Sequence, residues 1–232
     1  RPFPSRPKVQ HISSTEEYQL DLDVVIGLAK EKNLEKPWHL VAHSLGCLLG
    51  LRRLILEPKC FNSYIFLSPL WGNLKSLPRP VKQLLIKCEK VLHLLGLTKI
   101  TSENPKKYKP YSLTVNFKGN TLTSDKKQFN RLQTILRENT KLHSGTPTLG
   151  YLIAILKEID ELSLADLPNS KILVLLAEKE RITDNNAVMR FVRRHKFIET
   201  KNIAKAYHEL LIEKKEIRSK ALNLIHKFLK IT

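Results

Sequence analysis

The sequence predicts an α/β protein, in which a mostly parallel sheet is flanked by helices and interrupted by a helical insertion. Apolar runs of strand length alternate with segments of helical spacing in both terminal parts of the chain. Between them strand signals nearly vanish, and helical segments are separated by Gly, Pro, Asn and Ser. At residues 38–46 a short apolar run meets a serine turn and then a helical pattern. We therefore expect a core of residues 1–69 and 168–232, with residues 70–167 inserted as a helical cap or lid.

The N-terminal part is predicted to contain a loop, a helix and two strands. Residues 1–8 are rich in proline and are expected to form a loop. Ser14 and Glu17 have the spacing of a capping box, which predicts a helix that runs to about Lys32. The apolar run 64–68, which a proline follows, predicts the strand after the serine turn.

The serine turn has the pattern of a nucleophile elbow. Residues 40–42 predict a strand, Ser44 follows it, and a helical pattern begins at Leu45. A serine held in a strained backbone conformation needs small residues two positions before and after it, and Ala42 and Gly46 meet that need. The N–H of Leu45, at a helix N-terminus, is then placed to stabilise an oxyanion. The alternative is an ordinary turn between two core elements.

The insertion is expected to be helical and partly basic. Helices are predicted at about 125–139 and 150–162, after an earlier apolar stripe with lysines beside it. A basic amphipathic helix can lie on an anionic membrane surface, but packing against the rest of the protein is the preferred interpretation. The stripe consists of Val81, Leu84, Leu85, Cys88, Val91, Leu92 and Leu95, and the lysines are Lys82, Lys87 and Lys90.

Regular alternation returns in the last third of the chain. The continuous apolar run 171–177 predicts a strand buried on both faces. A helix at about 186–194, a strand at 197–203 and an amphipathic helix at 214–229 follow it. This order predicts a parallel sheet whose C-terminal edge, where ligands bind in such folds, lies under the insertion.

The elbow calls for an acid and a histidine further along the chain. In hydrolases of this kind the order is serine, acid, histidine, and the acid follows a strand. Glu178, Glu180 and Asp184 come directly after the run 171–177. His208 alone among the eight histidines lies between the last predicted strand and the final helix. The order is therefore met, which favours a serine hydrolase.

Composition limits the other function classes. The net charge of +18 comes from lysines spread along the chain, without the aromatic platform of a nucleic-acid surface, so nucleic acid is not expected as a partner. No apolar run is long enough for a transmembrane helix, and the first residues do not have the charged-then-apolar pattern of a signal segment. We expect a cytoplasmic protein, with peripheral contact with an anionic membrane as an option. The three cysteines, Cys47, Cys60 and Cys88, lack metal-ligand spacing, so reduced thiols are expected. The chemistry of a serine hydrolase calls for no metal or organic cofactor, and none is expected.

The chain resembles, over its whole length, the lysophospholipase L2-like branch of the α/β-hydrolases, a group also described as serine aminopeptidase S33-like. Residues 42–46 are similar to that family's elbow, Ala-His-Ser-Met-Gly, and residues 18–23 to its preceding helix. Matches within the cap are the most specific, because a generic hydrolase would not share them. They are residues 120–125 with Phe129 and Asn130, which resemble Leu-Thr-Ser-Asp…Phe, and residues 145–151, which resemble Gly-Gly-Pro-Thr-x-x-Trp.

The resemblance implies a catalytic triad and a substrate class. Ser44 is the nucleophile, His208 the base, and Glu180 occupies the place of the family's acid, an aspartate, with Asp184 as the alternative acid. Leu45 supplies one oxyanion N–H. The implied activity is hydrolysis of carboxylic esters, above all of lysophospholipids or related monoacyl lipids, without a cofactor.

A second departure concerns the N-terminal strands. Family members carry four strands before the helix that starts here near Ser14, and their loop gives the second oxyanion donor. We therefore expect half a sheet with an open edge, and three alternatives stay open. One is a truncated, inactive remnant or one half of a split hydrolase that needs an N-terminal segment. Another is a serine aminopeptidase. The third is a basic binding module without chemistry, in which Ser44→Ala changes nothing.

Overall fold

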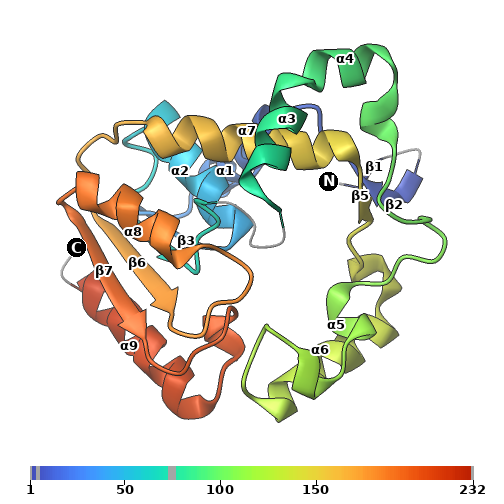
Figure 1. The fold of residues 1–232 in the computed structure, drawn as a ribbon. Helices are drawn as coiled ribbons and strands as arrows, with labels where there is room; N and C mark the ends of the chain where they lie inside the picture. The colour runs from blue at the N-terminus through green and yellow to red at the C-terminus, as the bar shows by residue number, and fades with distance from the viewer. Residues whose placement is uncertain (1, 4–5, 73–76, 231–232) are drawn as a thin grey trace. The chain divides into compact units, whose positions relative to one another are not determined.

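The computed structural model describes residues 2–3, 6–72 and 77–230 (Figure 1). The chain divides into two compact units, which we call the sheet unit and the insertion unit. The expected division into a core of residues 1–69 and 168–232 and a cap of residues 70–167 stays a prediction. The sheet unit consists of residues 19–76, 121–125 and 159–232, and the insertion unit of residues 1–18, 77–120 and 126–158.

The sheet unit contains a four-stranded sheet in which all paired strands are parallel. Its order is β3 (His39–His43), β4 (Ser63–Leu67), β6 (Ile172–Ala177) and β7 (Ile198–Ile203). All side chains of β4 and β6 are buried, as continuous apolar runs predict for strands covered on both faces. The predicted parallel sheet is confirmed. Because the strands are parallel, the residues that follow β3, β6 and β7 emerge at one edge of the sheet.

Helices cover both faces of this sheet (Figure 1). The final helix, α9 (Lys215–Lys230), packs on one face through Ala221 and Ile225. The opposite face carries α2 (Leu45–Leu56) and α8 (Asn185–Arg194), where the rings of Phe66, Trp71 and Phe191 are in contact. The helix α1 (Glu16–Glu31) is joined to α2 by the ion pair of buried Arg53 with Asp23 at 2.6 Å. These helices agree with the predicted ones to within two residues at each end.

One glycine decides how closely α2 approaches the sheet. A Cβ at Gly50 would lie 2.7 Å from Leu40 Cδ2 and 2.9 Å from Phe66 Cε1. Because Phe66 is fully buried, its ring has little room to move. The missing side chain at position 50 therefore allows the helix after the serine turn to lie directly on β3 and β4.

The insertion unit is mainly helical, as predicted, but it holds a small sheet that the sequence did not indicate. The sequence predicted a loop for residues 1–8. That prediction is wrong for residues 6–8, which are part of the strand β2 (Arg6–Gln10). The strand forms because β2 pairs with β5 (Thr146–Pro147), which lies far along the chain, and with β1 (Pro2–Phe3). Residues 1 and 4–5 of the predicted loop lie outside the described residues.

The helices of the insertion unit are short apart from two. They are α3 (Arg79–Lys87), α4 (Glu89–Leu94), α5 (Tyr111–Thr114), α6 (Lys126–Glu138) and α7 (Leu149–Leu164), with 3₁₀ turns at Leu97–Lys99, Phe117–Gly119 and Thr140–Leu142. The helix α7 belongs to this unit as far as Glu158, and its residues from Ile159 on belong to the sheet unit. A further 3₁₀ turn of the sheet unit, Leu210–Ile212, precedes α9. In the ranges that the structure describes, none of the helices combines the length and the apolar character needed to cross a membrane.

The apolar stripe of the insertion is not packed as the preferred interpretation required. It is divided at Cys88 between α3 and α4, so its two halves do not continue one helical face. Val81, Leu84, Val91 and Leu95 are exposed, with Leu95 at 66% of its full accessibility. The expectation that this stripe packs against the protein is therefore wrong for these four residues.

Candidate active site

Ser44 lies at the strand–turn–helix junction that the sequence predicted. It joins β3 to α2 with φ 51° and ψ −116°, a conformation that L-residues rarely adopt. Its N–H donates to the carbonyl of Leu67 at 3.0 Å, which ties the turn to β4. The Ser44 side chain does not cap α2. A nucleophile elbow requires both the strained serine backbone and a helix N-terminus that the serine side chain does not cap.

The first residue of α2 is Leu45, so its N–H lies at the positive end of the helix. A developing oxyanion beside Ser44 would be stabilised there. The predicted need for a small residue at position 46 is weaker than expected. A Cβ at Gly46 would lie 3.7 Å from the Cβ of Ala42, which is an ordinary contact that alanine would tolerate.

Glu180 and His208 are brought together at the same edge of the sheet. The Glu180 Oε2 atom lies 2.7 Å from Nδ1 of His208, and both residues are buried. The other carboxylate oxygen of Glu180 accepts from the N–H groups of Ile182 at 2.7 Å and Thr183 at 3.2 Å. Because a carboxylate only accepts, the proton of neutral His208 sits on Nδ1. Its Nε2 is then left as a base, which is the tautomer that general-base catalysis needs.

The environment keeps the Glu180 carboxyl charged. Burial raises its pKa, but the hydrogen bond and charge of His208 and the two backbone N–H groups outweigh burial and hold the pKa below its ordinary value. A charged carboxylate at this place orients the imidazole and stabilises its cation.

The other acids after β6 have different partners. Asp184 is the N-cap of α8, and its Oδ1 accepts from the N–H groups of Asn186 at 2.9 Å and Ala187 at 3.2 Å. Glu178 is exposed and accepts from the N–H of Lys205 at 2.6 Å. The contact with His208 therefore singles out Glu180 among the three, while the assignment of the catalytic acid stays a prediction.

Two residues that sequence reasoning missed hold the His208 backbone. His43 Nε2 lies 3.2 Å from the carbonyl oxygen of His208, and the two imidazoles meet edge to face at 4.6 Å. The hydroxyl of buried Ser68 donates to the same carbonyl at 2.7 Å. Burial lowers the pKa of His43, although Glu209, 3.8 Å away, opposes this. The position of His43 directly before Ser44 was the available signal in the sequence.

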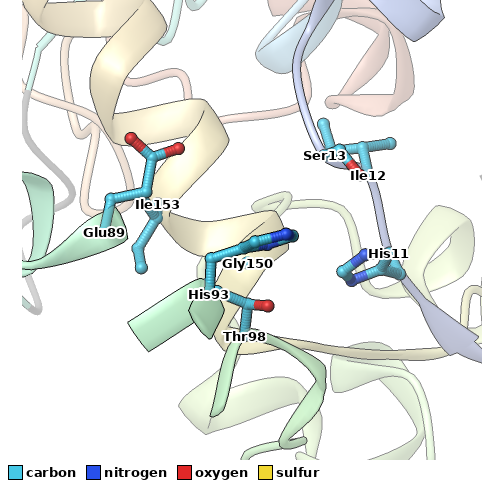
Figure 2. A pocket seen from close by; sticks show the side chains of 8 residues that line it. All are labelled: His11, Ile12, Ser13, Glu89, His93, Thr98, Gly150 and Ile153. Carbon is cyan, nitrogen blue, oxygen red and sulfur yellow. The ribbon is translucent and has the colours of Figure 1, made fainter. Parts of the chain in front are cut away.

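A separate small cavity lies in the insertion unit (Figure 2). The imidazoles of His11 and His93 point toward the same space, and His11 Nδ1 lies 2.8 Å from the hydroxyl of Thr148. Its volume of about 40 Å³ is too small for an acyl chain. Within the described ranges, no three His, Cys, Asp or Glu side chains are grouped to hold a metal ion. We assign no catalytic role to this cavity.

Comparison with known proteins gives matches along almost the whole chain. Residues 4–215 match the family model described as serine aminopeptidase, S33. A curated relative, the probable lysophospholipase L2 of Haemophilus influenzae, is 27% identical over 227 residues, which cover 97% of this chain and 70% of that protein.

Solved structures share the fold. A monoacylglycerol lipase of Paleococcus ferrophilus aligns with a TM-score of 0.66 at 17% identity, covering 94% of this chain and 76% of its own. A thermostable carboxyl esterase of Bacillus coagulans aligns with a TM-score of 0.69 at 13% identity, covering 97% and 74%. At these identities the likeness concerns the fold, and it agrees with the predicted mostly parallel sheet flanked by helices.

Proposed function

Since this chain belongs to the serine aminopeptidase S33 family of α/β-hydrolases, we propose that it is a serine hydrolase of carboxylic esters. The substrate class that we propose is lysophospholipids or related monoacyl lipids. Relatives named as a probable lysophospholipase and a monoacylglycerol lipase support this choice. A serine aminopeptidase, which the family's description suggests, is the competing activity within the same chemistry.

The proposed mechanism uses groups at the C-terminal edge of the sheet. Ser44 Oγ attacks the acyl carbonyl while Nε2 of His208 takes the hydroxyl proton, and the same imidazole returns it to the leaving alcohol. The Glu180 carboxylate holds the imidazole with its proton on Nδ1 and stabilises the cation. The N–H of Leu45 stabilises the tetrahedral oxyanion. Water then attacks the acyl-enzyme with His208 as its base.

The observation that carries this proposal is the buried contact between Glu180 and His208. Burying a charged carboxylate costs free energy unless hydrogen-bond donors replace its lost hydration. Both oxygens of Glu180 have such donors: one lies 2.7 Å from Nδ1 of buried His208, and the other accepts from the N–H of Ile182 in the local turn. In this chain Glu180 follows β6, and the strained Ser44 turn follows β3 in the same parallel sheet, with β4 between the two strands. The serine, acid and histidine also occur in the chain order of α/β-hydrolases.

The deciding experiment is labelling with a fluorophosphonate, which reacts only with an activated serine. We expect label on the wild type and its loss in Ser44→Ala and in His208→Ala. Exposed residues of the same types, Ser102→Ala and His226→Ala, serve as matched controls and should keep the label. Label that persists in Ser44→Ala would refute the assignment of the nucleophile. Monoacylglycerol, lysophospholipid and aminoacyl substrates would then separate esterase from aminopeptidase activity.

We also propose that the exposed apolar residues of α3 and α4 contact anionic membrane. Leu94 is 84% exposed, and contact with a lipid surface would remove this apolar side chain from water. Lys87, Lys90 and Lys99 are exposed beside these helices and add the matching charge. Substrate lipids reside in such surfaces, which links this contact to the proposed activity.

Vesicles of phosphatidylcholine, with and without phosphatidylserine, test this contact by sedimentation. We expect binding only with the anionic lipid, weakened by salt as surface charges are screened. Leu94→Ser should reduce it. Leu164→Ser, which changes a leucine 77% exposed elsewhere, should not. Binding that is insensitive to salt would contradict the proposal.

The edge of the sheet supports a second candidate, in which catalysis needs a further polypeptide segment. In the described part of the chain β3 pairs only with β4, and Val41 in β3 is 46% exposed. Four apolar residues of α1 are exposed as well: Leu20, Val24, Val25 and Leu28. Strands added at this edge would cover apolar surface and supply a second oxyanion donor. Cooperative unfolding of the chain alone, together with fluorophosphonate labelling, would argue against this candidate. A folded chain without label would favour it.

A further inference from the structure

The segment 121–125 lies between two stretches of the insertion unit along the chain, yet it belongs to the sheet unit. It is paired with the loop that carries the histidine. The carbonyl of Thr121 accepts from the N–H of His208 at 3.5 Å, and the carbonyl of Leu122 accepts from the N–H of Glu209 at 2.8 Å. A motif first noted in the predicted cap thus contacts the backbone of the proposed base directly.

A buried carboxylate completes this contact. Glu213 has no exposed surface, and one of its oxygens accepts from the N–H of Tyr207 at 2.6 Å. The other oxygen accepts from the N–H of Ser124 at 3.1 Å and from its hydroxyl at 2.5 Å. It also accepts from the N–H of Lys214 at 3.1 Å. One side chain therefore joins the residue before His208 to the segment 121–125.

Such an arrangement is specific because of its cost. A carboxylate taken out of water is stable only when donors replace the lost hydration, and each donor left without it would be unsatisfied in turn. The donors around Glu213 come from three places in the chain, so the carboxylate fixes them relative to one another. Ser68 and His43 hold the carbonyl of His208 as described above. The backbone N–H groups of Tyr207, His208 and Glu209 and the carbonyl of His208 are therefore all hydrogen-bonded.

We propose that Glu213 and the segment 121–125 form a brace that positions the imidazole of His208. Glu213 is a positioning residue in this inference, which rests on the proposed serine hydrolase function. The brace makes the rate of catalysis depend on a segment about 90 residues away along the chain. A displacement of a catalytic group by about 1 Å can lower a rate by about 100-fold, so the contribution is measurable.

Glu213→Gln tests the brace with a minimal change of volume. A glutamine has one accepting oxygen, so its amide group must face either Tyr207 N–H or the donors of Ser124 and Lys214. Donor then faces donor, and the loop must shift. We expect the rate constant of fluorophosphonate labelling of the folded protein to fall by about 100-fold. On an ester substrate, kcat should fall with little change in KM. Glu216→Gln, the same exchange on an exposed residue nearby, is the matched control.

Ser124 supplies a second, milder test in case Glu213→Gln does not fold. Ser124→Ala removes the hydroxyl donor and should lower the rate constant, whereas Ser124→Thr keeps a hydroxyl and should restore most of it. A readout independent of activity is the low-field proton NMR signal of His208 Nδ1–H bonded to Glu180. That signal should shift or broaden in Glu213→Gln and in Ser124→Ala, and stay unchanged in Glu216→Gln.

The outcomes separate the two levels of inference. An unlabelled wild type overturns the proposal that this chain alone is a serine hydrolase, and the NMR signal then decides the brace on its own. A labelled wild type with unchanged rate constants in Glu213→Gln and Ser124→Ala overturns the brace and leaves the hydrolase. Lower thermal stability with an unchanged rate constant would show that Glu213 serves the fold only, which also overturns it.

Discussion

Replacing Glu180 by glutamine removes the charge of the proposed acid and keeps its shape. The carboxylate now accepts from His208 on one oxygen and from the N–H groups of Ile182 and Thr183 on the other. A glutamine has only one oxygen for these two sides. If that oxygen faces His208, its amide group confronts two buried N–H donors. The favoured orientation therefore turns the amide group toward the imidazole.

This orientation inverts the tautomer of the histidine. An amide N–H donates, so Nδ1 of His208 must accept and the ring proton moves to Nε2. A protonated Nε2 cannot take the proton of Ser44. The comparable exchange in a serine protease triad lowers kcat by about 10⁴-fold. At about 1.36 kcal/mol for each factor of ten, we expect about 5.4 kcal/mol of lost transition-state stabilisation.

The assay is ester turnover combined with the rate of fluorophosphonate labelling. Asp184→Asn is the control, because Asp184 is the alternative acid and caps α8 through the N–H groups of Asn186 and Ala187. Asparagine also caps helices well, so this variant should lose less than about 1 kcal/mol of stability and keep its rate. Circular dichroism should show that both variants are folded.

The reasoning is refuted if Glu180→Gln keeps the activity and Asp184→Asn loses it. A Glu180→Gln protein that keeps a tenth or more of the wild-type rate would show that this carboxylate does not set the tautomer. Loss of activity in Asp184→Asn, with its helix content intact, would transfer the role of the acid to Asp184. Loss in both would point to the loop between β6 and α8 as a unit.

Three further predictions concern stability and reactivity. Burial lowers the pKa of His43 from 6.5, so the unfolded chain binds more protons just below that pH, and the free energy of unfolding should fall as the pH drops below 6.5. The pKa of Glu180 is raised by burial but lowered more by its hydrogen bonds, to a net value below 4.5, so a second loss should follow below pH 4.5; urea unfolding from pH 8 to pH 3.5 measures both, and His43→Gln should remove part of the first. Gly50→Ala should cost about 1–3 kcal/mol in urea unfolding, because its Cβ would overlap buried side chains, whereas Gly27→Ala, with open space around it in α1, should stabilise by up to about 1 kcal/mol; equal effects would refute the close approach of α2. Cys47 is fully buried and burial raises the pKa of its thiol well above 9.0, so iodoacetamide at pH 8 should alkylate it only after unfolding, and reaction in the native protein would contradict the described burial.

The sheet unit was predictable because its signals are local. The run 172–177 is apolar at every position, and a buried parallel strand is the structure that such a run favours. The turn at Ser44 needs a strand before it and a helix after it, and both are encoded within residues 39–56. Chain order then limited the base to His208 and the acid to three positions, of which the structure distinguishes one by contact.

Features that depend on distant partners were not predictable. The strand β2 forms through pairing with Thr146 and Pro147, whereas the proline-rich residues 1–8, which include its first three residues, favour a loop. Leu84 and Leu95 are exposed, and the chain passes from α3 to α4 at Cys88; the 3.6-residue period reveals neither feature. A pattern within one segment carries no information on what the rest of the chain leaves uncovered.

Charge serves two different ends in this chain, and neither follows from the net value of +18. Three carboxylates lie around the His208 loop: Glu180 contacts its imidazole, Glu209 lies 3.8 Å from His43, and Glu213 accepts from the N–H of Tyr207. In the proposed mechanism the Glu180 carboxylate, which contacts the ring directly, stabilises the imidazole as it becomes a cation during the reaction. Glu180 and Glu213 are buried, so salt screens them little. The exposed lysines act over the Debye length of about 8–10 Å, which salt shortens. Vesicle binding should therefore weaken with salt while turnover of a soluble ester does not, because salt screens the exposed lysines but not the buried carboxylates.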